Sequence, residues 1–375
     1  ETAYHMLSYW EYKSWLQQVD FTIVGSGIVG INCALALRKK FPKAKIIILE
    51  RGILPQGAST KNAGFACFGS VSEILEDLKS HSEEEVTNLI QNRWTGIQHL
   101  RSLLGDEKLK FHSLGGYEVF SEKETDLYEE CLKARQAINS MLSPIFGHSV
   151  FEERSNTFGF QNIKETLLWN QFEGQLDTGE MMRGLLDLAL KQDILILNSI
   201  TVTSFEENAS QVSIKTDKFD MESSYLLVAT NGFAKEILNE QVQPARAQVL
   251  ITKPINDLSI KGTFHMYKGF NYFRNVENRI LLGGGRHLNM DQEETVSFGQ
   301  SEEIKTYLLS LLSEVILPDT DFEIDQWWSG IMGVGRKKHP IVKPVGARVY
   351  CGVRLGGMGV AIGSAVGQEL ADLIS

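Results

Sequence analysis

Cysteine is scarce in this chain, and its cysteines are far apart. The four residues, Cys33, Cys67, Cys131 and Cys351, form no C-x-x-C pair. Scattered cysteines are typical of a reducing compartment and offer no metal-site spacing. The pattern excludes a disulfide scaffold, and we expect free thiols and no bound metal.

Long apolar runs and an excess of basic residues are also missing. No apolar run approaches the roughly 20 residues that a membrane span requires, and the first residues lack the basic start and apolar stretch of a signal peptide. Lys and Arg total 37 against 47 Asp and Glu, a net charge of -10 that is unsuited to nucleic-acid phosphates. We therefore expect a cytoplasmic protein with no transmembrane segment and no nucleic-acid partner, as a monomer or an oligomer.

Aromatic residues are concentrated at the N-terminus. The extension formed by residues 1–17 holds Tyr4, Tyr9, Trp10, Tyr12 and Trp15. These rings could anchor the chain at a membrane interface. Alternatively, they pack on the protein's own surface or on a second subunit.

Three glycines mark the first chemical motif. Gly25, Gly27 and Gly30 follow the apolar run "FTIV" and precede the helical pattern "IVGINCALALRKKF". A second apolar run, "KIIILE", ends at Glu50, where a dinucleotide-binding unit places an acid for a ribose hydroxyl. Glycines permit a tight turn and a close backbone approach, so a pyrophosphate can lie at the positive end of the helix. The unit predicts that the protein binds a dinucleotide, which could carry either a nicotinamide or a flavin.

The 375 residues exceed one typical domain, and the patterns predict two interleaved domains. The fold class is α/β with α+β character. We assign a Rossmann-like dinucleotide-binding domain to residues 18–80, 150–240 and 321–375. A substrate domain with a mostly antiparallel sheet takes residues 81–149 and 241–320. In the last predicted helix, Gly359, Gly363, Gly367 and Ala371 form a small-residue stripe, which either admits a flat group or packs tightly on a sheet.

Taken in order, several motifs resemble the D-amino-acid oxidase superfamily of flavoproteins, which includes glycine oxidase, sarcosine oxidase and gamma-glutamylputrescine oxidase. The resemblance covers the chain from about residue 18. It is carried by "VGSGIVG", "IILERG", "GASTKNAGF", "EGQLDTGEMMRGLLDLA", "VATNGF", "PARAQVLIT", "NYFRNVENRILLGGG", "QWWSGIMG" and "LGGMGVAIGSAVGQELADLI".

The resemblance implies FAD as the cofactor. The start of the last helix could face the flavin ring and stabilise the negative charge of the reduced form. The resemblance also implies that Glu50 and Arg51 hold the adenosine ribose and that Val202 lies near the adenine. The expected cofactor-binding residues are Gly25, Ser26, Gly27, Ile28, Val29, Gly30, Glu50, Arg51, Gly57, Ala58, Ser59, Thr60, Lys61, Asn62, Ala63, Gly64, Val202, Thr230, Asn231, Gly232, Gly357, Met358, Gly359 and Val360.

In some relatives a cysteine near the "WSG" segment is linked covalently to the flavin. Here "WWSGIMGVGRKKHP" contains no cysteine, and Cys351 falls within a predicted strand. We therefore expect non-covalent FAD.

The resemblance implies oxidation of a C–N bond in a small amine or amino acid. Hydride goes to flavin N5 and the imine is then hydrolysed, so positioning supplies much of the rate. One alternative is a dehydrogenase that passes electrons to a quinone or carrier. Others are a flavoprotein module in RNA modification and a protein that binds FAD without amine turnover. The electron acceptor stays open.

Arg274 and Tyr272 are the expected substrate-facing residues. They share a strand face by alternation, and a guanidinium fork suits a carboxylate. The alternative is a surface arginine paired across the sheet. A second arginine of amino acid oxidases is replaced near Met332, which counts against simple amino acids as substrates.

The turn "RLGGMG" introduces Arg354, a third catalytic candidate, and puts Met358 where relatives place a histidine. The basic hairpin 336–343 could attract an anionic substrate or acceptor, or it is a solvated tip. His112, His265 and His287 are isolated in sequence, and we expect them to be structural or exposed.

Overall fold

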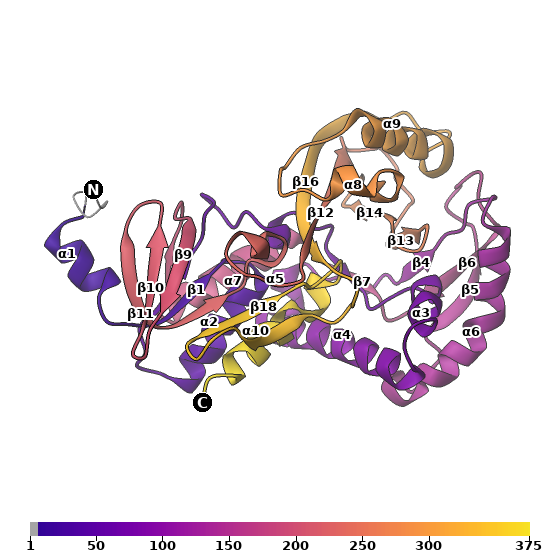
Figure 1. Cartoon of the computed structure of the whole chain (residues 1–375). Helices are drawn as coiled ribbons and strands as arrows, with labels where there is room; N and C mark the ends of the chain where they lie inside the picture. The colour runs from indigo at the N-terminus through magenta and orange to yellow at the C-terminus, as the bar shows by residue number, and fades with distance from the viewer. Residues whose placement is uncertain (1–6) are drawn as a thin grey trace.

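Two large sheets form the framework of the computed structural model, which describes residues 7–375 (Figure 1). The expected α/β class, a Rossmann-like part beside a mostly antiparallel sheet, is confirmed. Tyr4 lies outside the described residues.

The first sheet has a parallel centre in the order β18-β11-β1-β2-β8. Its strands are short and apolar, as buried parallel strands are. The bounds are β1 (Val19–Val24), β2 (Ile46–Leu49), β8 (Leu195–Leu197), β11 (Asp220–Val228) and β18 (Val349–Val353), with antiparallel additions β9 (Val202–Glu207), β10 (Val212–Thr216) and β17 (Ile341–Pro344).

Helices cover one face of this sheet. Alternate residues of β1 and β2, such as Ile23 and Ile48, share one apolar core with the helices, while Val24 and Ile47 join a core on the opposite face. The helices in the first core are α2 (Ile28–Lys40), α4 (Glu83–Leu104), α7 (Thr178–Lys191) and α10 (Gly359–Asp372).

Part of the small-residue stripe of α10 packs on a helix and not on a sheet. A Cβ on Gly363 would lie 2.7 Å from the Ile28 side chain, and one on Gly367 would lie 2.6 Å from the Val29 carbonyl oxygen. Both neighbours belong to α2, so this part of the stripe allows two helices to approach closely. A Cβ on Gly359 would have only the Leu355 side chain within 4 Å, at 3.9 Å, so room for a flat group at this end of the stripe stays a prediction.

The second sheet has the order β16-β12-β15-β14-β13-β4-β6-β5, and only the β13–β4 pair is parallel. Its apolar core includes the stacked rings of Phe264 and Phe273. The bounds are β4 (Gly116–Glu118), β5 (Phe151–Ser155), β6 (Thr166–Asn170), β12 (Gln243–Thr252), β13 (Thr263–Met266), β14 (Asn271–Val276), β15 (Arg279–Gly284) and β16 (Ile324–Val334).

Helices and short elements complete the fold. They are α1 (Tyr9–Glu11), η2 (Tyr12–Leu16), η3 (Ala58–Thr60), β3 (Phe65–Ala66), α3 (Val71–Leu78), α5 (Asp106–Leu109), α6 (Thr125–Phe146), β7 (Gly174–Gln175), η4 (Asn231–Glu236), η5 (Arg286–Leu288), α8 (Met290–Glu293), α9 (Glu302–Leu311) and η6 (Leu312–Ile316).

Strand membership differs from the predicted domain division. Strands β5, β6 and β16 belong to the second sheet, although residues 150–240 and 321–375 were assigned to the FAD-binding part. Helix α4, assigned to the substrate part, packs on α10 through Gly96, whose Cβ would lie 1.9 Å from the Ala361 carbonyl oxygen. Local sequence patterns predict the helices and strands, but they do not predict which sheet each strand joins.

At the N-terminus, the described part of the extension projects from the first sheet (Figure 1). Tyr9 and Trp10 are 66% and 67% exposed, so they do not pack on the protein's own surface. Among residues 7–375, no helix combines the length and the apolar character needed to cross a membrane. The four cysteines are free and buried, as expected.

Candidate active site

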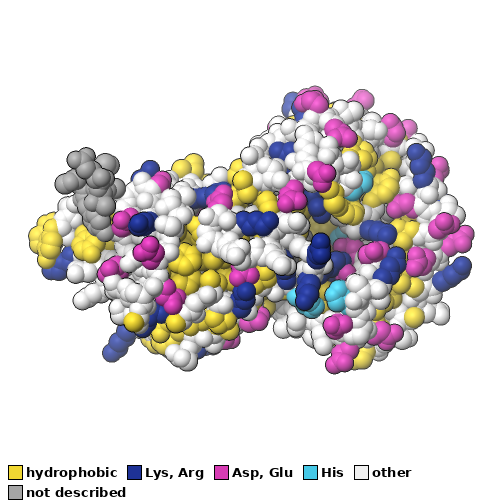
Figure 2. Space-filling model, viewed as in Figure 1, with side chains coloured by type: hydrophobic (Ala, Val, Ile, Leu, Met, Phe, Trp, Pro, Cys, Tyr) yellow, Lys and Arg dark blue, Asp and Glu magenta, His cyan; other side chains and the backbone are white. Residues whose placement is uncertain are grey.

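A large cavity of about 730 Å³ is lined by residues of both sheets. Figure 2 shows Lys, Arg and His side chains gathered around a hollow where the two lobes meet. Most of the expected cofactor residues line the cavity: Gly25, Gly27, Ile28, Val29, Glu50, Arg51, Gly57, Ala58, Ser59, Lys61, Asn62, Ala63, Gly64, Val202, Thr230, Asn231, Gly232, Gly357, Met358, Gly359 and Val360.

At one end of the cavity is the turn between β1 and α2. Gly25 has a φ of +103°, which disfavours any side chain. A Cβ on Gly30 would lie 1.9 Å from the Gly25 carbonyl oxygen, and one on Gly27 would lie 2.8 Å from the Ser59 hydroxyl. All three glycines are therefore required by the turn or by the loop packed against it.

The acid after β2 is oriented by this turn. Glu50 is buried, and its Oε2 accepts hydrogen bonds from the Ser26 hydroxyl at 2.7 Å and the Ser26 amide at 3.1 Å. Its Oε1 accepts from the Gly52 amide at 2.9 Å. The carboxylate is thus fixed at the cavity wall, as a ribose-binding acid requires.

Three expected cofactor residues support the cavity without lining it. Ser26 is fully buried behind Glu50, and Gly30 lies beneath the turn. The Thr60 hydroxyl donates to the Pro55 carbonyl at 2.6 Å. These positions shape the backbone, a distinction that a motif match cannot make.

Arg51 and Val202 line the cavity together with Glu50. The Arg51 guanidinium lies 3.9 Å from the centre of the Phe233 ring, and its Nη1 is 2.8 Å from the Glu236 carboxylate. Ile200 and Thr201 line the same part. Arg51 thus forms part of the cavity wall together with Phe233, and Glu236 balances the charge of Arg51.

The start of α10 forms another wall. Its N-cap residue, Met358, provides no side-chain cap, and Gly357, Gly359 and Val360 line the cavity. A Cβ on Gly357 would have no atom within 4 Å. The positive end of the helix is therefore open toward the cavity.

Arg274 does not face the cavity, which corrects its expected role. Its Nη1 donates to the carbonyls of Leu176, Ala63 and Gly64 at 2.7, 3.0 and 3.1 Å. It is buried, so it is not a surface arginine either, and burial lowers its pKa to about 10. The side chain fastens β14 to the loop after η3.

Tyr272 does line the cavity, on the same strand face as Arg274. Its ring packs on Gly283, where a Cβ would lie 2.5 Å away, and meets Phe65 edge-on with 5.8 Å between centres. Its hydroxyl has no hydrogen-bond partner in the described part of the chain. Burial raises the pKa of Tyr272 to about 12, so the phenol stays neutral and can donate.

Arg286 is a cavity residue that the sequence interpretation missed. It opens η5 directly after Gly284 and Gly285, whose φ values are +130° and +83°. Its contacts are weak: Nη1 lies 3.9 Å from the Met290 sulfur, and the guanidinium lies 5.5 Å from the Phe270 ring centre. Within residues 7–375 it forms no ion pair, and burial lowers its pKa. A partly buried cation without a counter-ion suits an anionic ligand.

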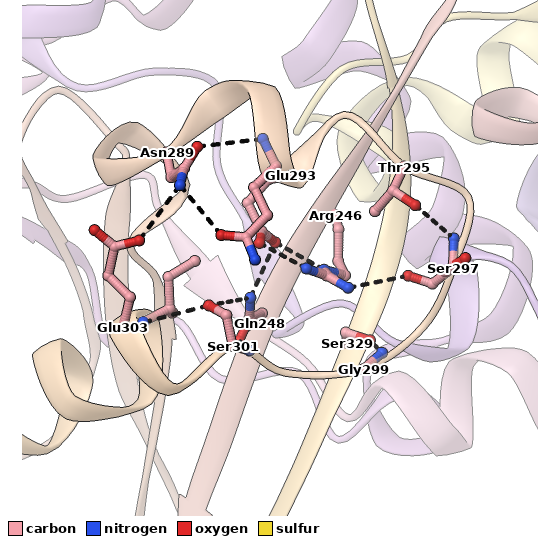
Figure 3. A network of polar contacts seen from close by, with 12 residues as sticks. Arg246, Gln248, Asn289, Glu293, Thr295, Ser297, Gly299, Ser301, Glu303 and Ser329 are labelled. Atoms are coloured by element: carbon pink, nitrogen blue, oxygen red, sulfur yellow. Dashed lines mark hydrogen bonds and ion pairs between the residues drawn. The ribbon is translucent and has the colours of Figure 1, made fainter.

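A buried network holds the segment that follows Arg286 (Figure 3). Arg246 of β12 donates to both carboxylate oxygens of Glu293 in α8, at 2.8 and 2.7 Å. Gln248 Nε2 donates to the same carboxylate at 3.0 Å. Because strand residues alternate, Ala247 and Val249 face the cavity instead. The charge of Arg246 is therefore used to anchor α8.

Arg354 lines the cavity, but its donors are occupied. Its Nη2 and Nε donate to the His339 carbonyl at 2.9 and 3.1 Å, and Nη1 donates to the Gln241 carbonyl at 3.3 Å. These three bonds brace the basic hairpin, and the expected catalytic role of Arg354 stays a prediction.

The basic residues of the hairpin differ in their surroundings, and both interpretations of the hairpin stay open. Lys337 and Lys338 line the cavity, as an anion-attracting role requires. Lys338 is paired with Asp77, and Lys343 lies 2.9 Å from Glu240, so these two charges are balanced locally.

The three isolated histidines have different surroundings. His112 is exposed, and His287 packs against the rings of Tyr267, Phe270 and Tyr307. His265 lines the cavity and is 6% exposed. Its Nε2 lies 2.5 Å from the Glu173 carboxylate. His265 is therefore buried and paired, not exposed, and its expected structural role stays a prediction.

The chain belongs to the FAD dependent oxidoreductase family DAO, whose model matches residues 20–373. A relative, the probable oxidoreductase OrdL of Haemophilus influenzae, is 20% identical over 96% of this chain and 83% of its own. Glycine oxidase from Geobacillus kaustophilus has a TM-score of 0.75 at 18% identity, covering 94% of both chains. L-proline dehydrogenase from P. horikoshii has a TM-score of 0.74 at 16% identity, covering 96% of this chain and 94% of its own.

The cavity fits the FAD that this family requires. It joins the glycine turn and Glu50 to the open start of α10, as an elongated dinucleotide needs. Among its wall residues, Thr230 has a buried hydroxyl with no partner, an unmet polar group that a ligand can satisfy. The protein is an FAD-dependent oxidoreductase.

Proposed function

We propose that the protein oxidises the C–N bond of a small amine or amino acid that carries an anionic group. The carrying observation is Arg286, a guanidinium that forms no ion pair within residues 7–375 and lies beside Tyr272 in the cavity that fits FAD. The names of the structural neighbours, glycine oxidase and L-proline dehydrogenase, support an amino acid.

Arg286 and Tyr272 are the proposed anion-binding pair. A guanidinium fork matches the two oxygens of a carboxylate, and a neutral phenol can donate a further hydrogen bond. Tyr272 lies opposite Gly283 in the β14–β15 ladder, and Arg286 follows three residues later, which brings the two donors to one region. Met332, on the β16 wall, offers no comparable group.

When bound, FAD would supply the hydride-acceptor chemistry that oxidation of the carbon next to the nitrogen requires. The protein's contribution is to hold that carbon in a fixed position, through Arg286, Tyr272 and the ring of Phe65. The imine product then hydrolyses in water. Whether oxygen or a carrier removes the electrons stays open, and oxygen consumption compared with dye reduction distinguishes the two.

We also propose that the FAD is not covalently linked. Cys351 is buried in β18, away from the cavity. Cys67 does line the cavity, but burial raises the pKa of its thiol well above the usual value, which disfavours the reactive thiolate. Acid precipitation tests the proposal, since free FAD in the supernatant supports it and a yellow pellet contradicts it.

An anaerobic screen tests the proposed reaction. The purified, FAD-loaded protein is mixed with glycine, L-proline, other amino acids and simple amines, and loss of the visible flavin band is recorded. We expect at least one amino acid to bleach the flavin and simple amines of equal size to act more weakly. Bleaching by no compound contradicts the proposal.

A further inference from the structure

The cavity wall near Tyr272 holds a His–Glu pair that has no role in the reaction described above. His265 of β13 and Tyr272 of β14 lie directly opposite each other in the antiparallel ladder. Such opposed side chains share one face. The Phe65 ring meets His265 edge-on at 5.2 Å, as it does Tyr272. His265 thus lies beside the proposed anion-binding pair.

One ring nitrogen of His265 is committed to Glu173. The Nε2–Oε1 distance is 2.5 Å, and the Thr263 hydroxyl donates to the same carboxylate at 2.6 Å. Gly116 makes room for Glu173, because a Cβ there would lie 2.2 Å from the carboxylate carbon. Glu173 is 2% exposed, so this orientation is built into the interior.

The other ring nitrogen, Nδ1, is uncommitted. It has no hydrogen-bond partner in the described part of the chain, and His265 lines the cavity. A buried carboxylate bonded to one nitrogen fixes the tautomer that leaves a lone pair on the other. In its neutral form, His265 therefore has an unpartnered ring nitrogen that can accept a proton in a residue that lines the cavity.

We propose that His265 Nδ1 accepts the proton that a substrate ammonium loses before oxidation, with Glu173 as a positioning residue. This inference rests on the proposed amine oxidation. An N–H bond of the ammonium breaks, an N–H bond forms at Nδ1, and the electron pair stays on the substrate nitrogen. That pair then assists departure of hydride from the adjacent carbon, and His265 returns its proton to water.

The charges around His265 set the pH at which it can act. Burial alone lowers its pKa, but the carboxylates of Glu173, Glu73 and Glu118 together outweigh burial and raise the pKa to about 9. The ionisable groups that face it come from four directions: Glu173 before β7, Cys67 after β3, Glu73 on α3, and Glu118 on β4. Neutral Tyr272 faces it from β14. The fraction of His265 that is neutral, and can therefore accept a proton, increases as the pH rises through about 9.

Two variants and two measurements test the inference on the FAD-loaded protein. Stopped-flow reduction, with the amino acid that best bleaches the wild-type flavin, is followed against pH. Nuclear magnetic resonance of histidine-labelled protein follows protonation of His265 independently of turnover. The variants are Glu173→Gln and His265→Gln, with exposed His148→Gln as the control.

We expect the kinetic inflection and the His265 resonance to titrate together near pH 9 in the wild type. In Glu173→Gln both move down together by at least about one pH unit, because a neighbouring charge that shifts a pKa has been removed. The pKa of the substrate itself is the same in every protein, so it cannot cause this movement. His265→Gln loses the inflection and reduces the flavin about 100-fold or more slowly.

An unchanged kinetic inflection in either variant overturns the inference and favours Glu73, a carboxylate that also lines the cavity. If Glu173→Gln does not retain FAD, the His265→Gln profile decides alone. Failure of the wild type to be reduced by any amine contradicts the proposed function instead, so the two failures are distinguishable.

Discussion

The Cα atom of Gly30 lies so close to the carbonyl oxygen of Gly25 that a Cβ on Gly30 would be 1.9 Å from that oxygen. Both atoms belong to the turn that joins β1 to α2. The turn and the helix must therefore separate if Gly30 acquires a side chain.

We predict that Gly30→Ala abolishes tight FAD binding. The substitution displaces the first turn of α2 from Gly25, so the backbone no longer approaches a pyrophosphate. The flavin-to-protein absorbance ratio of the purified variant is the measurement. Gly179→Ala, in the first turn of α7, is the control, because its Cβ would meet only the Asp177 side chain at 3.2 Å. Equal flavin content in both variants contradicts the prediction.

Arg286→Met should weaken binding of carboxylate ligands about 10- to 100-fold, since a charge-assisted hydrogen bond contributes about 1.5–3 kcal/mol. The effect should appear in the Kd of an anionic amino acid analogue and much less for an uncharged amine. Flavin perturbation spectra give both constants. Arg183→Met, which removes an exposed arginine on α7, is the matched control. A Kd unchanged by Arg286→Met removes Arg286 from the site.

Arg274→Met should act on stability. The substitution leaves the carbonyls of Ala63, Gly64 and Leu176 buried without their donor, and an unsatisfied buried group costs about 1–3 kcal/mol. Denaturant unfolding should therefore show a loss of at least about 2 kcal/mol. Arg286→Met is the contrast and should unfold close to the wild type. If Arg274→Met keeps full stability but loses carboxylate binding, the sequence-based role was right.

Glu118 should make stability depend on pH. It is buried on β4, and burial raises its pKa to about 7, although Ser72 opposes this through hydrogen bonds. The folded protein thus holds this proton more tightly than the unfolded chain. The stabilisation is fully present below the unfolded pKa of 4.5 and is lost as the pH rises through about 7.

Glu118→Gln keeps a neutral side chain at every pH. When the pH is raised from below 4.5 to above 7, the free energy of unfolding of the wild type should fall. We expect this fall to be about 3 kcal/mol larger than that of the variant. Urea unfolding across the pH range measures the difference. Exposed Glu122→Gln should parallel the wild type. Parallel curves for Glu118→Gln would show that its carboxyl titrates normally.

Local sequence signals predicted residues that line the cavity around the glycine turn and the start of α10. The glycine turn, Glu50 and the start of α10 depend on backbone geometry that only certain residues permit, so the residue types reveal them. Of the three expected residues that do not line the cavity, Ser26 lies in the glycine turn, Gly30 in the first turn of α2 and Thr60 in η3.

The substrate end was predicted less well, for a physical reason. Alternation placed Tyr272 and Arg274 on one strand face, and that is correct. It could not show that the face is open at Tyr272 but covered by Ala63, Gly64 and Leu176 at Arg274. Tertiary packing decides this. The signal for Arg286 was available, since it follows three glycines whose last members adopt positive φ.

His265 shows the same limit. Its partner Glu173 is 92 residues away in sequence, and no spacing rule connects them. The parallel β4–β13 pair brings Gly116 and Thr263 together and so creates the space that Glu173 occupies. Sheet order, which sequence patterns do not specify, therefore created the buried pair.

The central claim is that one cavity holds FAD between the glycine turn and α10 and presents an amine to it. The most direct measurement is the visible spectrum of the purified protein during anaerobic titration with amino acids. We predict a flavin spectrum that bleaches on addition of at least one amino acid and returns with an electron acceptor. A colourless protein that takes up no added FAD would contradict the account.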